Sequence, residues 1–169
     1  MGGSRTSSKG VKLVSLADEV QGIADVIKAK FPDALIHYYQ EPIPAERENG
    51  QFVIILKQDI RRSESLSQTW TQRQYSVIGY GEDVQQAVSR MEDLSRFMMN
   101  EQGSALTPAA GRALKIESFS FDGAEQMEGG LQKCTAVLQL QYREPVATEE
   151  FTKMSHIGVR TEYNSKGGH

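Results

Sequence analysis

The residues most able to do chemistry are few and far apart in this 169-residue sequence. Its three histidines, His37, His156 and His169, have none of the spacings of a zinc-binding helix or a zinc ligand set. Cys134 is the only cysteine, so neither an intrachain disulfide nor a multi-cysteine metal site can form. Its place in an alternating run predicts an inward strand position, where a thiol behaves as a small hydrophobic group. We therefore expect no catalytic residue, no metal and no cofactor.

The stretch GYGED at 79–83 places two glycines between an expected strand and an expected helix, as phosphate-binding loops do. It lacks the Gly-Lys-Ser/Thr ending of a P-loop and the third glycine of a dinucleotide fingerprint. Glu82 and Asp83 would also place negative charge where a phosphate would bind. We interpret Asp83 as the N-cap of the following helix.

Charge is nearly balanced, with 19 basic and 22 acidic residues and a formal net charge of -3. A broad nucleic-acid or membrane surface normally needs a basic excess, so we expect no membrane partner and no sequence-specific nucleic acid. No apolar run approaches the roughly 20 residues that cross a bilayer. The sharpest cationic feature is Arg61–Arg62, expected in a polar loop or in an extension of the preceding strand. Two such arginines could bind carboxylates of a partner protein, or simply face solvent.

Hydrophobic periodicity predicts two amphipathic helices. The first begins with a capping box at Ser15 and Asp18 and ends at Pro32. Its apolar stripe is Val20, Ile23, Ala24, Ile27 and Phe31, and its outer face is Asp18, Glu19, Asp25, Lys28 and Lys30. The second, over 84–98, has the apolar stripe Val84, Ala87, Val88, Met91, Leu94 and Met98.

Five strands are expected, over residues 35–39, 51–58, 69–81, 113–121 and 134–143. The first two are expected to pair as a hairpin. The long third strand has a first half that looks polar on both faces, so we expect its residues Trp70 through Gln74 to meet a neighbouring subunit. Aromatic residues are frequent at interface centres, and Trp70 is the only tryptophan.

These elements predict an α+β domain over residues 12–145, with a largely antiparallel mixed sheet and both helices on one face, in the order α-β-β-β-α-β-β. Flexible terminal arms are expected over residues 1–11 and 146–169, where little can be buried.

Four segments together resemble one protein family: ADVIKAKFPDALIHYYQE at 24–41, QFVIILKQ at 51–58, YSVIGYGEDVQQAVSRMEDL at 75–94, and LQLQYREP at 138–145. With the element order, they resemble the tail terminator (tail completion) proteins of long-tailed bacteriophages, over about residues 15–145. The resemblance implies a hexameric ring that binds the last ring of tail-tube subunits, stops polymerisation and presents a surface to the head connector. It implies no catalytic residue.

The same resemblance implies a place at the head-proximal end of the virion tail, after assembly in the host cytoplasm, with genome DNA passing through the ring. We expect the interface residues to be Arg61, Arg62, Trp70, Gln72, Gln74, Asp122, Glu125 and Glu128. The last three lie in a second polar loop, and we expect at least one of the two loops to face the tube or connector and to be poorly ordered. Two alternatives stay open: a connector or stopper protein of the same particle, and a small hydrolase.

Overall fold

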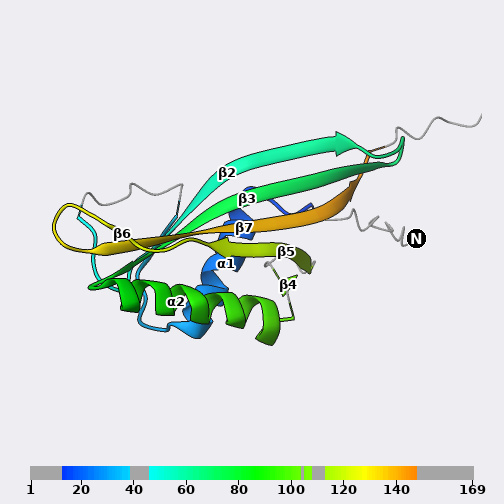
Figure 1. The fold of residues 1–169 in the computed structure, drawn as a ribbon. Coiled ribbons are helices and arrows are strands. Elements are labelled where there is room, and N and C mark those ends of the chain that lie inside the picture. Colours follow the sequence, from blue (N-terminus) through cyan, green and yellow to red (C-terminus); the bar gives the residue numbers. More distant parts are fainter. Residues whose placement is uncertain (1–12, 39–45, 104, 108–112, 148–169) are drawn as a thin grey trace, which may run out of the picture.

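The computed structural model describes residues 13–38, 46–103, 105–107 and 113–147 (Figure 1). Its helical elements are α1 (Leu16–Lys30), α2 (Val84–Arg96) and a π-helical turn, η1 (Phe97–Glu101). Its strands are β1 (Ile36–Tyr38), β2 (Phe52–Ser63), β3 (Gln68–Gly81), β4 (Ala105–Leu106), β5 (Leu114–Phe121), β6 (Glu125–Gln126) and β7 (Gln132–Pro145). The α+β class with two helices and a mixed sheet is therefore confirmed. The π-helical turn and the short strands β4 and β6 were not expected.

Both helices begin at the side chains that the sequence indicated. At α1, the Asp18 amide donates to Ser15 Oγ (3.1 Å) and the Ser15 amide donates to Asp18 Oδ2 (3.1 Å), which completes a capping box. At α2, the Gln86 amide donates to Asp83 Oδ1 at 2.7 Å, so the N-cap interpretation of Asp83 is confirmed.

Gly81 explains why the loop before α2 contains glycine. A Cβ atom at this position would lie 2.7 Å from the backbone nitrogen of Ala87, closer than real Cβ contacts come. The glycine therefore serves the close approach of β3 to α2. One expected core position of α2 is wrong: Val84, the first residue of the helix, is 52% exposed, whereas Met91 and Leu94 further along it are fully buried.

The sheet has the strand order β1-β2-β3-β7-β5-β4, and β6 pairs with β7 beside this path. The pairs of β2 with β3, β3 with β7, β5 with β7, and β4 with β5 are antiparallel. The expected hairpin between the first two strands is wrong, because β1 pairs with β2 in parallel. A parallel pair requires the chain to return to the same end of the sheet between its strands, and residues 39–51 separate β1 from β2.

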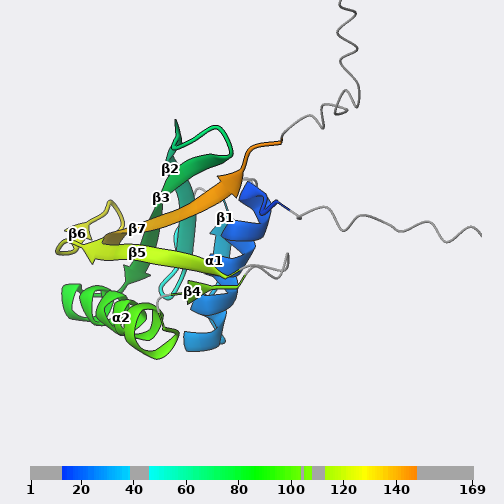
Figure 2. The ribbon, with the colours of Figure 1, turned by 90° about the vertical axis from the view of Figure 1, so that its right-hand side faces the viewer.

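We call the sheet face that packs on the helices the inner face, and the opposite face the outer face. The sheet curls around α1 and α2, and Figure 2 shows both helices within this curl. The inner side chains of β7 are all buried, as the alternating pattern predicted: Cys134, Ala136, Leu138, Leu140 and Tyr142. They join Tyr75, Ile23, Ile27, Met91 and Leu94 in one hydrophobic core.

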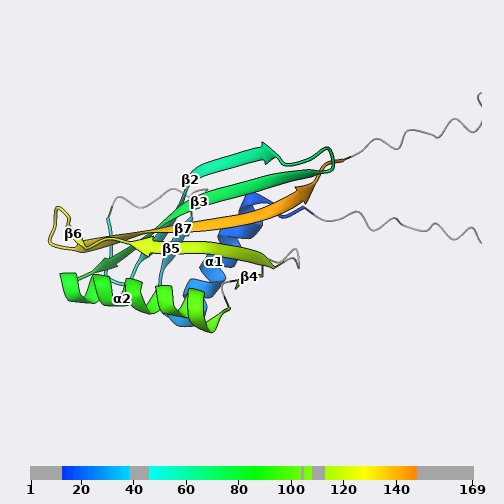
Figure 3. The ribbon, with the colours of Figure 1, turned by 45° about the vertical axis from the view of Figure 1, so that its right-hand side comes forward.

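The paired ends of β2 and β3 extend past the helices, together with the end of β7 (Figures 1 and 3). Asp59 to Ser63 belong to β2 rather than to a loop, because they pair in register with Arg73 to Thr69. Of the two expectations for this segment, the strand extension is confirmed and the loop location of Arg61 and Arg62 is wrong. The expected arms at 1–11 and from residue 148 onward lie outside the described residues. None of the described helices is long and apolar enough to cross a membrane.

Candidate protein-interaction surface

The extended end of the sheet presents two surfaces, because successive side chains of a strand point to opposite faces. Arg62 of β2, Trp70 of β3 and Arg143 of β7 stand opposite one another in one row of the outer face. The neighbouring row, Arg61, Thr71 and Tyr142, belongs to the inner face. Arg61 and Arg62 therefore act on different surfaces, although the sequence suggested that they would act together.

The outer row is centred on Trp70, which is half-buried on its own sheet. The Arg62 guanidinium lies over the indole, 5.5 Å from the ring centroid, at the distance of a cation–π contact. On the other side, Arg143 donates from Nε and Nη2 to the two carboxylate oxygens of Glu64, at 2.6 and 2.8 Å. This bidentate pair fixes the Arg143 side chain beside Trp70.

Glutamines continue the outer surface toward the domain body. Gln74 Nε2 donates to Gln139 Oε1 at 3.2 Å, and both residues stand opposite each other in register. In the next row, Gln72 faces Gln141. When the Gln141 amide is oriented from its hydrogen-bond network, its oxygen accepts from Trp70 Nε1 and its nitrogen donates to Glu117 at 3.1 Å.

We name Arg62, Trp70, Gln72, Gln74, Gln139, Gln141 and Arg143 the outer surface. The predicted interface residues Arg62, Trp70, Gln72 and Gln74 are brought together here by the register of β2 and β3. Amide side chains can both donate and accept, and Trp and Arg are the residues that most often dominate binding energy at interfaces. The arrangement suits contact with another protein.

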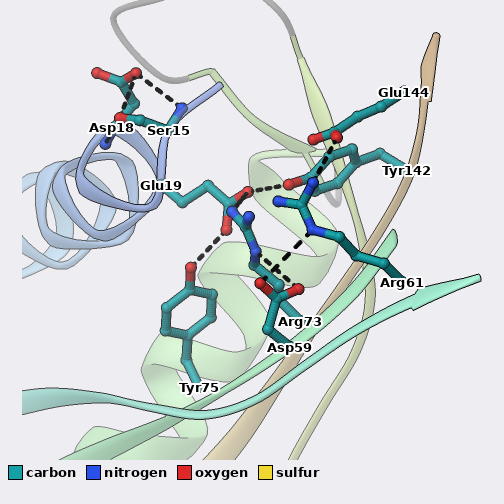
Figure 4. Close-up of polar contacts among 9 residues, drawn as sticks. All are labelled: Ser15, Asp18, Glu19, Asp59, Arg61, Arg73, Tyr75, Tyr142 and Glu144. Carbon is teal, nitrogen blue, oxygen red and sulfur yellow. Dashed lines mark hydrogen bonds and ion pairs between the residues drawn. The ribbon is translucent and has the colours of Figure 1, made fainter. Parts of the chain in front are cut away.

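The inner face of the same strands contains a chain of ion pairs (Figure 4). Arg61 Nη1 lies 3.1 Å from Glu144 Oε2, and Arg61 Nε lies 3.8 Å from Asp59. Asp59 also lies 3.4 Å from Arg73 Nε. The expectation that the first half of β3 is wet on both faces is wrong, because Thr71 and Arg73 are buried at 0% and 3% exposure. The N-terminal part of α1 covers them.

Glu19 of α1 closes this chain of charges and is itself fully buried. Its Oε1 accepts from Arg73 Nη1 at 2.7 Å and from the Tyr142 hydroxyl at 2.6 Å. Its Oε2 accepts from the Tyr75 hydroxyl at 2.5 Å. Three donors from two strands thus converge on one carboxylate of the helix, and fix α1 against β3 and β7 (Figure 4).

Burial dominates the acid–base properties of this cluster. It raises the pKa of the Glu19 carboxyl, although the hydrogen bonds from Tyr142 and Tyr75 and the charge of Arg73 oppose the rise. Burial and then the adjacent Glu19 raise the pKa values of the Tyr75 and Tyr142 hydroxyls. Burial is the largest influence on the pKa of Arg73 and would lower it, but Glu19, together with Tyr142, Asp59 and Tyr75, outweighs burial, so this pKa is raised.

The outer-face assignment of Glu19 in α1 is wrong, and the sequence contained a signal against it. Glu19 precedes Ile23 and Ile27 by one and two steps of four residues, so it lies on the buried stripe of the helix. A charged residue within an apolar stripe indicates a buried partner, and Arg73 is that partner. Nothing in the local sequence of β3 identifies Arg73, because the contact joins residues 54 positions apart.

The second predicted loop lies at the opposite end of the sheet from Arg62 and Trp70. There β6 pairs with the first residues of β7, and Glu125 lies 3.3 Å from Lys133 Nζ. Hydrogen bonds order its turn, since the Met127 amide donates to the Leu131 carbonyl at 2.8 Å. The structure therefore does not bring Asp122, Glu125 and Glu128 together with the two arginines.

Comparisons with known proteins leave the family of this chain open. No protein-family model matches it, and no curated protein does. A solved structure whose title names no function is similar over 79% of this chain and 94% of its own, with 13% identity and a TM-score of 0.40. A likeness of this size carries no argument about function.

Proposed function

We propose that this chain is a tail terminator of a long-tailed bacteriophage or a related tail-like particle. In this proposal it forms a ring, which we expect to be a hexamer, at the head-proximal end of the tail. The ring binds the last ring of tail-tube subunits, ends their polymerisation and offers its other face to the head connector. The proposal rests on the sequence resemblance, and the outer surface is the structural observation that supports it.

The outer surface is suited to repeated contacts between subunits. It stands on strands that extend past the helices, so a neighbouring protein can reach it without meeting the domain body (Figure 3). Its centre is Trp70, which Arg62 contacts on the face of the ring and the Gln141 amide contacts at Nε1. A braced aromatic side chain loses little conformational entropy when it binds, so more of its contact energy remains as affinity.

The two ends of the sheet offer different surfaces, which is compatible with a ring of identical subunits. The outer surface lies at one end, and the acidic turn with Asp122, Glu125 and Glu128 lies at the other. A contact between two different surfaces of identical chains is heterologous, and such contacts close into a ring when the rotation between subunits allows. Each weak polar pair is then repeated at every subunit.

The test is to add the purified chain to tail-tube subunits during polymerisation and to measure tube lengths by electron microscopy. Shorter tubes with added density at one end are expected. Unchanged tube lengths and bare ends would overturn the proposal. Binding to a connector ring, without binding to tubes, would instead identify the alternative, a connector or stopper protein.

A further inference from the structure

One edge of the sheet is unpaired over much of its length. The short strand β1 pairs with β2 only at residues 52–54. Beyond this point, residues 55–63 pair with β3 on one side, and no described strand pairs with them on the other. Figure 1 shows β2 as the uppermost strand of the extended end. Alternate residues along this free edge present backbone N–H and C=O groups to which a further strand can bind.

The sequence after the described residues contains a segment with the pattern of such a strand. HIGVRTEY, at 156–163, alternates between two kinds of residue. Every second position is β-branched or aromatic, and these types are frequent in strands: Ile157, Val159, Thr161 and Tyr163. The remaining sequence from 148 to 169 has no comparable alternation. Within the region expected to be a flexible arm, this segment is therefore the exception.

The described chain ends at the end of the sheet where this pairing would begin. β7 ends at Pro145, and the Val146 amide donates to the Ser67 carbonyl, in the turn between β2 and β3, at 2.9 Å. β2 ends at the same end of the sheet, since Ser63 stands opposite Thr69 near the start of β3. A chain that turns back from here runs opposite to β2, so it would pair with β2 in the antiparallel sense.

The connecting residues are long enough for the chain to reach the free edge. The strand order β2-β3-β7 places a strand added to β2 three strand spacings from β7, which is roughly 14 Å. Residues 148–155 can span roughly 26 Å when extended. The segment can therefore reach the edge of its own chain, and a second copy is not required.

Charged side chains along the free edge restrict which strand can pair there. Lys57, Asp59 and Arg61 are exposed on this part of β2, and such charges commonly keep edge strands from pairing. The Asp59 side chain is 36% exposed although it contacts Arg61 and Arg73, so a further cation can approach it. Like charges directly opposite each other are destabilising, so an added strand must bring opposite charges to these positions.

One antiparallel register of the segment meets this condition. In this register Arg160 stands opposite Asp59. Glu162 then lies beside Lys57, at the irregular position of β2 where the register with β3 shifts. A shift of two residues in either direction would place Arg160 opposite Arg61 or Lys57, which repel it. A shift of one residue would move every side chain of the segment to the other face.

We propose that residues 156–163 add an antiparallel strand to the free edge of β2 in the same chain, in the register that pairs Arg160 with Asp59. The added strand occupies backbone groups that would otherwise be open to the edges of other chains. Directly opposite residues of paired strands share a face, so its β-branched side chains continue the outer face beside Ile60. The inference goes beyond the proposed tail terminator, because it concerns a single chain and holds or fails without the tail tube.

Hydrogen exchange of the full chain, followed by NMR, tests the pairing. In wild type, the alternate amides of residues 58–63 that do not bond to β3 should exchange slowly. Val159→Pro removes a donor from the added strand, so these amides should exchange about 10-fold faster or more. The control, Ser165→Pro, lies after the segment and should leave their exchange unchanged. Fast exchange in wild type, or equal exchange in the two variants, overturns the proposal.

A disulfide tests the register and distinguishes one chain from two. In a Cys134→Ala background, Val159→Cys and Ile60→Cys are combined in one chain, which is then mildly oxidised. A disulfide requires Cα atoms within about 7 Å, so a linked peptide pair is expected in the monomer band of a non-reducing gel. In the control, Ala105→Cys, in β4 at the other edge of the sheet, replaces Ile60→Cys. No link, a covalent dimer in place of the linked monomer, or equal yields in both chains overturns the proposal.

Discussion

The inner and outer faces of β2, β3 and β7 contain the same kinds of residues and use them in opposite ways. Arg73 and Arg62 lie on adjacent strands, yet Arg73 is buried against Glu19, while Arg62 is exposed above Trp70. On the inner face every charge is matched by an internal partner: Glu19 by Arg73, and Arg61 by Glu144. On the outer face the polar groups are arranged in rows that a second protein can reach.

The residue type alone therefore does not show whether a charged residue of this sequence serves folding or binding. A buried ion pair is costly to desolvate and contributes little net stability, but removal of one partner leaves an uncompensated buried charge. An exposed pair is screened by solvent and contributes little either way. Substitutions should therefore affect folding on the inner face and assembly on the outer face.

The largest effect is expected from Glu19→Ala. It leaves Arg73 buried without its nearest carboxylate and removes the acceptor of both tyrosine hydroxyls, so the free energy of unfolding should fall by about 3 to 5 kcal/mol. Urea denaturation followed by circular dichroism measures the change. The control is Asp25→Ala, on the exposed side of α1, which should change the free energy by no more than about 0.5 kcal/mol. Equal effects of both would contradict the buried network.

Leu94→Ala should come next, with a loss of about 2 to 5 kcal/mol in the free energy of unfolding. Leu94 is fully buried in the core between α2 and the inner face, so the substitution leaves a cavity. The same denaturation experiment measures it, and Val88→Ala, half-buried on the same helix, should cost less. An unchanged unfolding midpoint for Leu94→Ala would show that the inner face has been misplaced.

Trp70→Ala should weaken association between subunits by about 2 kcal/mol or more, while the domain stays folded. Trp70 is half-buried on the outer face, and its side chain is not part of the hydrophobic core. Light scattering over a dilution series gives the association constant, and circular dichroism checks the fold. If Trp70→Ala unfolds the chain, or if it assembles as tightly as wild type, the outer surface is not the contact.

The inner face should also respond to pH. The folded pKa of Glu19 is raised above 4.5, so the folded chain holds a proton that the unfolded chain has lost. The stabilising effect of this bound proton is fully present below pH 4.5 and is lost as the pH rises through the raised pKa of the folded chain. The slope is at most about 1.4 kcal/mol per pH unit for one proton. Arg73, Tyr75 and Tyr142, which face this carboxyl, stay protonated there because their pKa values are raised.

Denaturation midpoints of wild type and Glu19→Gln, measured from pH 4.5 upward, test whether stability falls as the pH rises. The wild-type chain should lose stability with rising pH in this range, and the Glu19→Gln chain should lack this component. A wild-type chain that instead gains stability, relative to Glu19→Gln, would show that Arg73 and the tyrosines outweigh burial.

The smallest effect separates the two adjacent arginines. Arg62→Ala removes the cation–π contact with Trp70 and should weaken association by about 0.5 to 1 kcal/mol, with little change in stability. Arg61→Ala breaks the pair with Glu144 and should lower stability by at most about 1 kcal/mol, with little change in association. Both quantities are measured for both variants. If the two variants behave alike, the division between faces has no energetic meaning.

Local signals in the sequence were sufficient for the helices and for most strands. The capping residues Ser15 and Asp83 act through bonds to their own helices, and the alternation of β7 reflects the core directly. The sequence left the end of β2 open between a loop and a strand extension, because Asp59 to Ser63 are almost all polar and only pairing with β3 makes them a strand. A pattern of hydrophobic burial cannot reveal such a segment.

The candidate surface was partly predictable, because part of it follows from local strand geometry. Alternation along β3 is enough to place Trp70, Gln72 and Gln74 on one face, since this follows from strand geometry alone. The partners of that face come from β2 and β7, and their register depends on contacts across the whole sheet.

The register of β3 also sets an order of folding. Its pairing with β2 closes through a short turn, whereas Gln74 meets Gln139 across 65 positions and Glu19 meets Tyr142 across 123. Short loops close faster than long ones, so we expect the β2–β3 hairpin to form first and β7 to dock afterwards. Pulse-labelled hydrogen exchange would show this delay. Nascent chains would then lack the Arg143 and glutamine rows of the outer surface until β7 has docked and folding is complete.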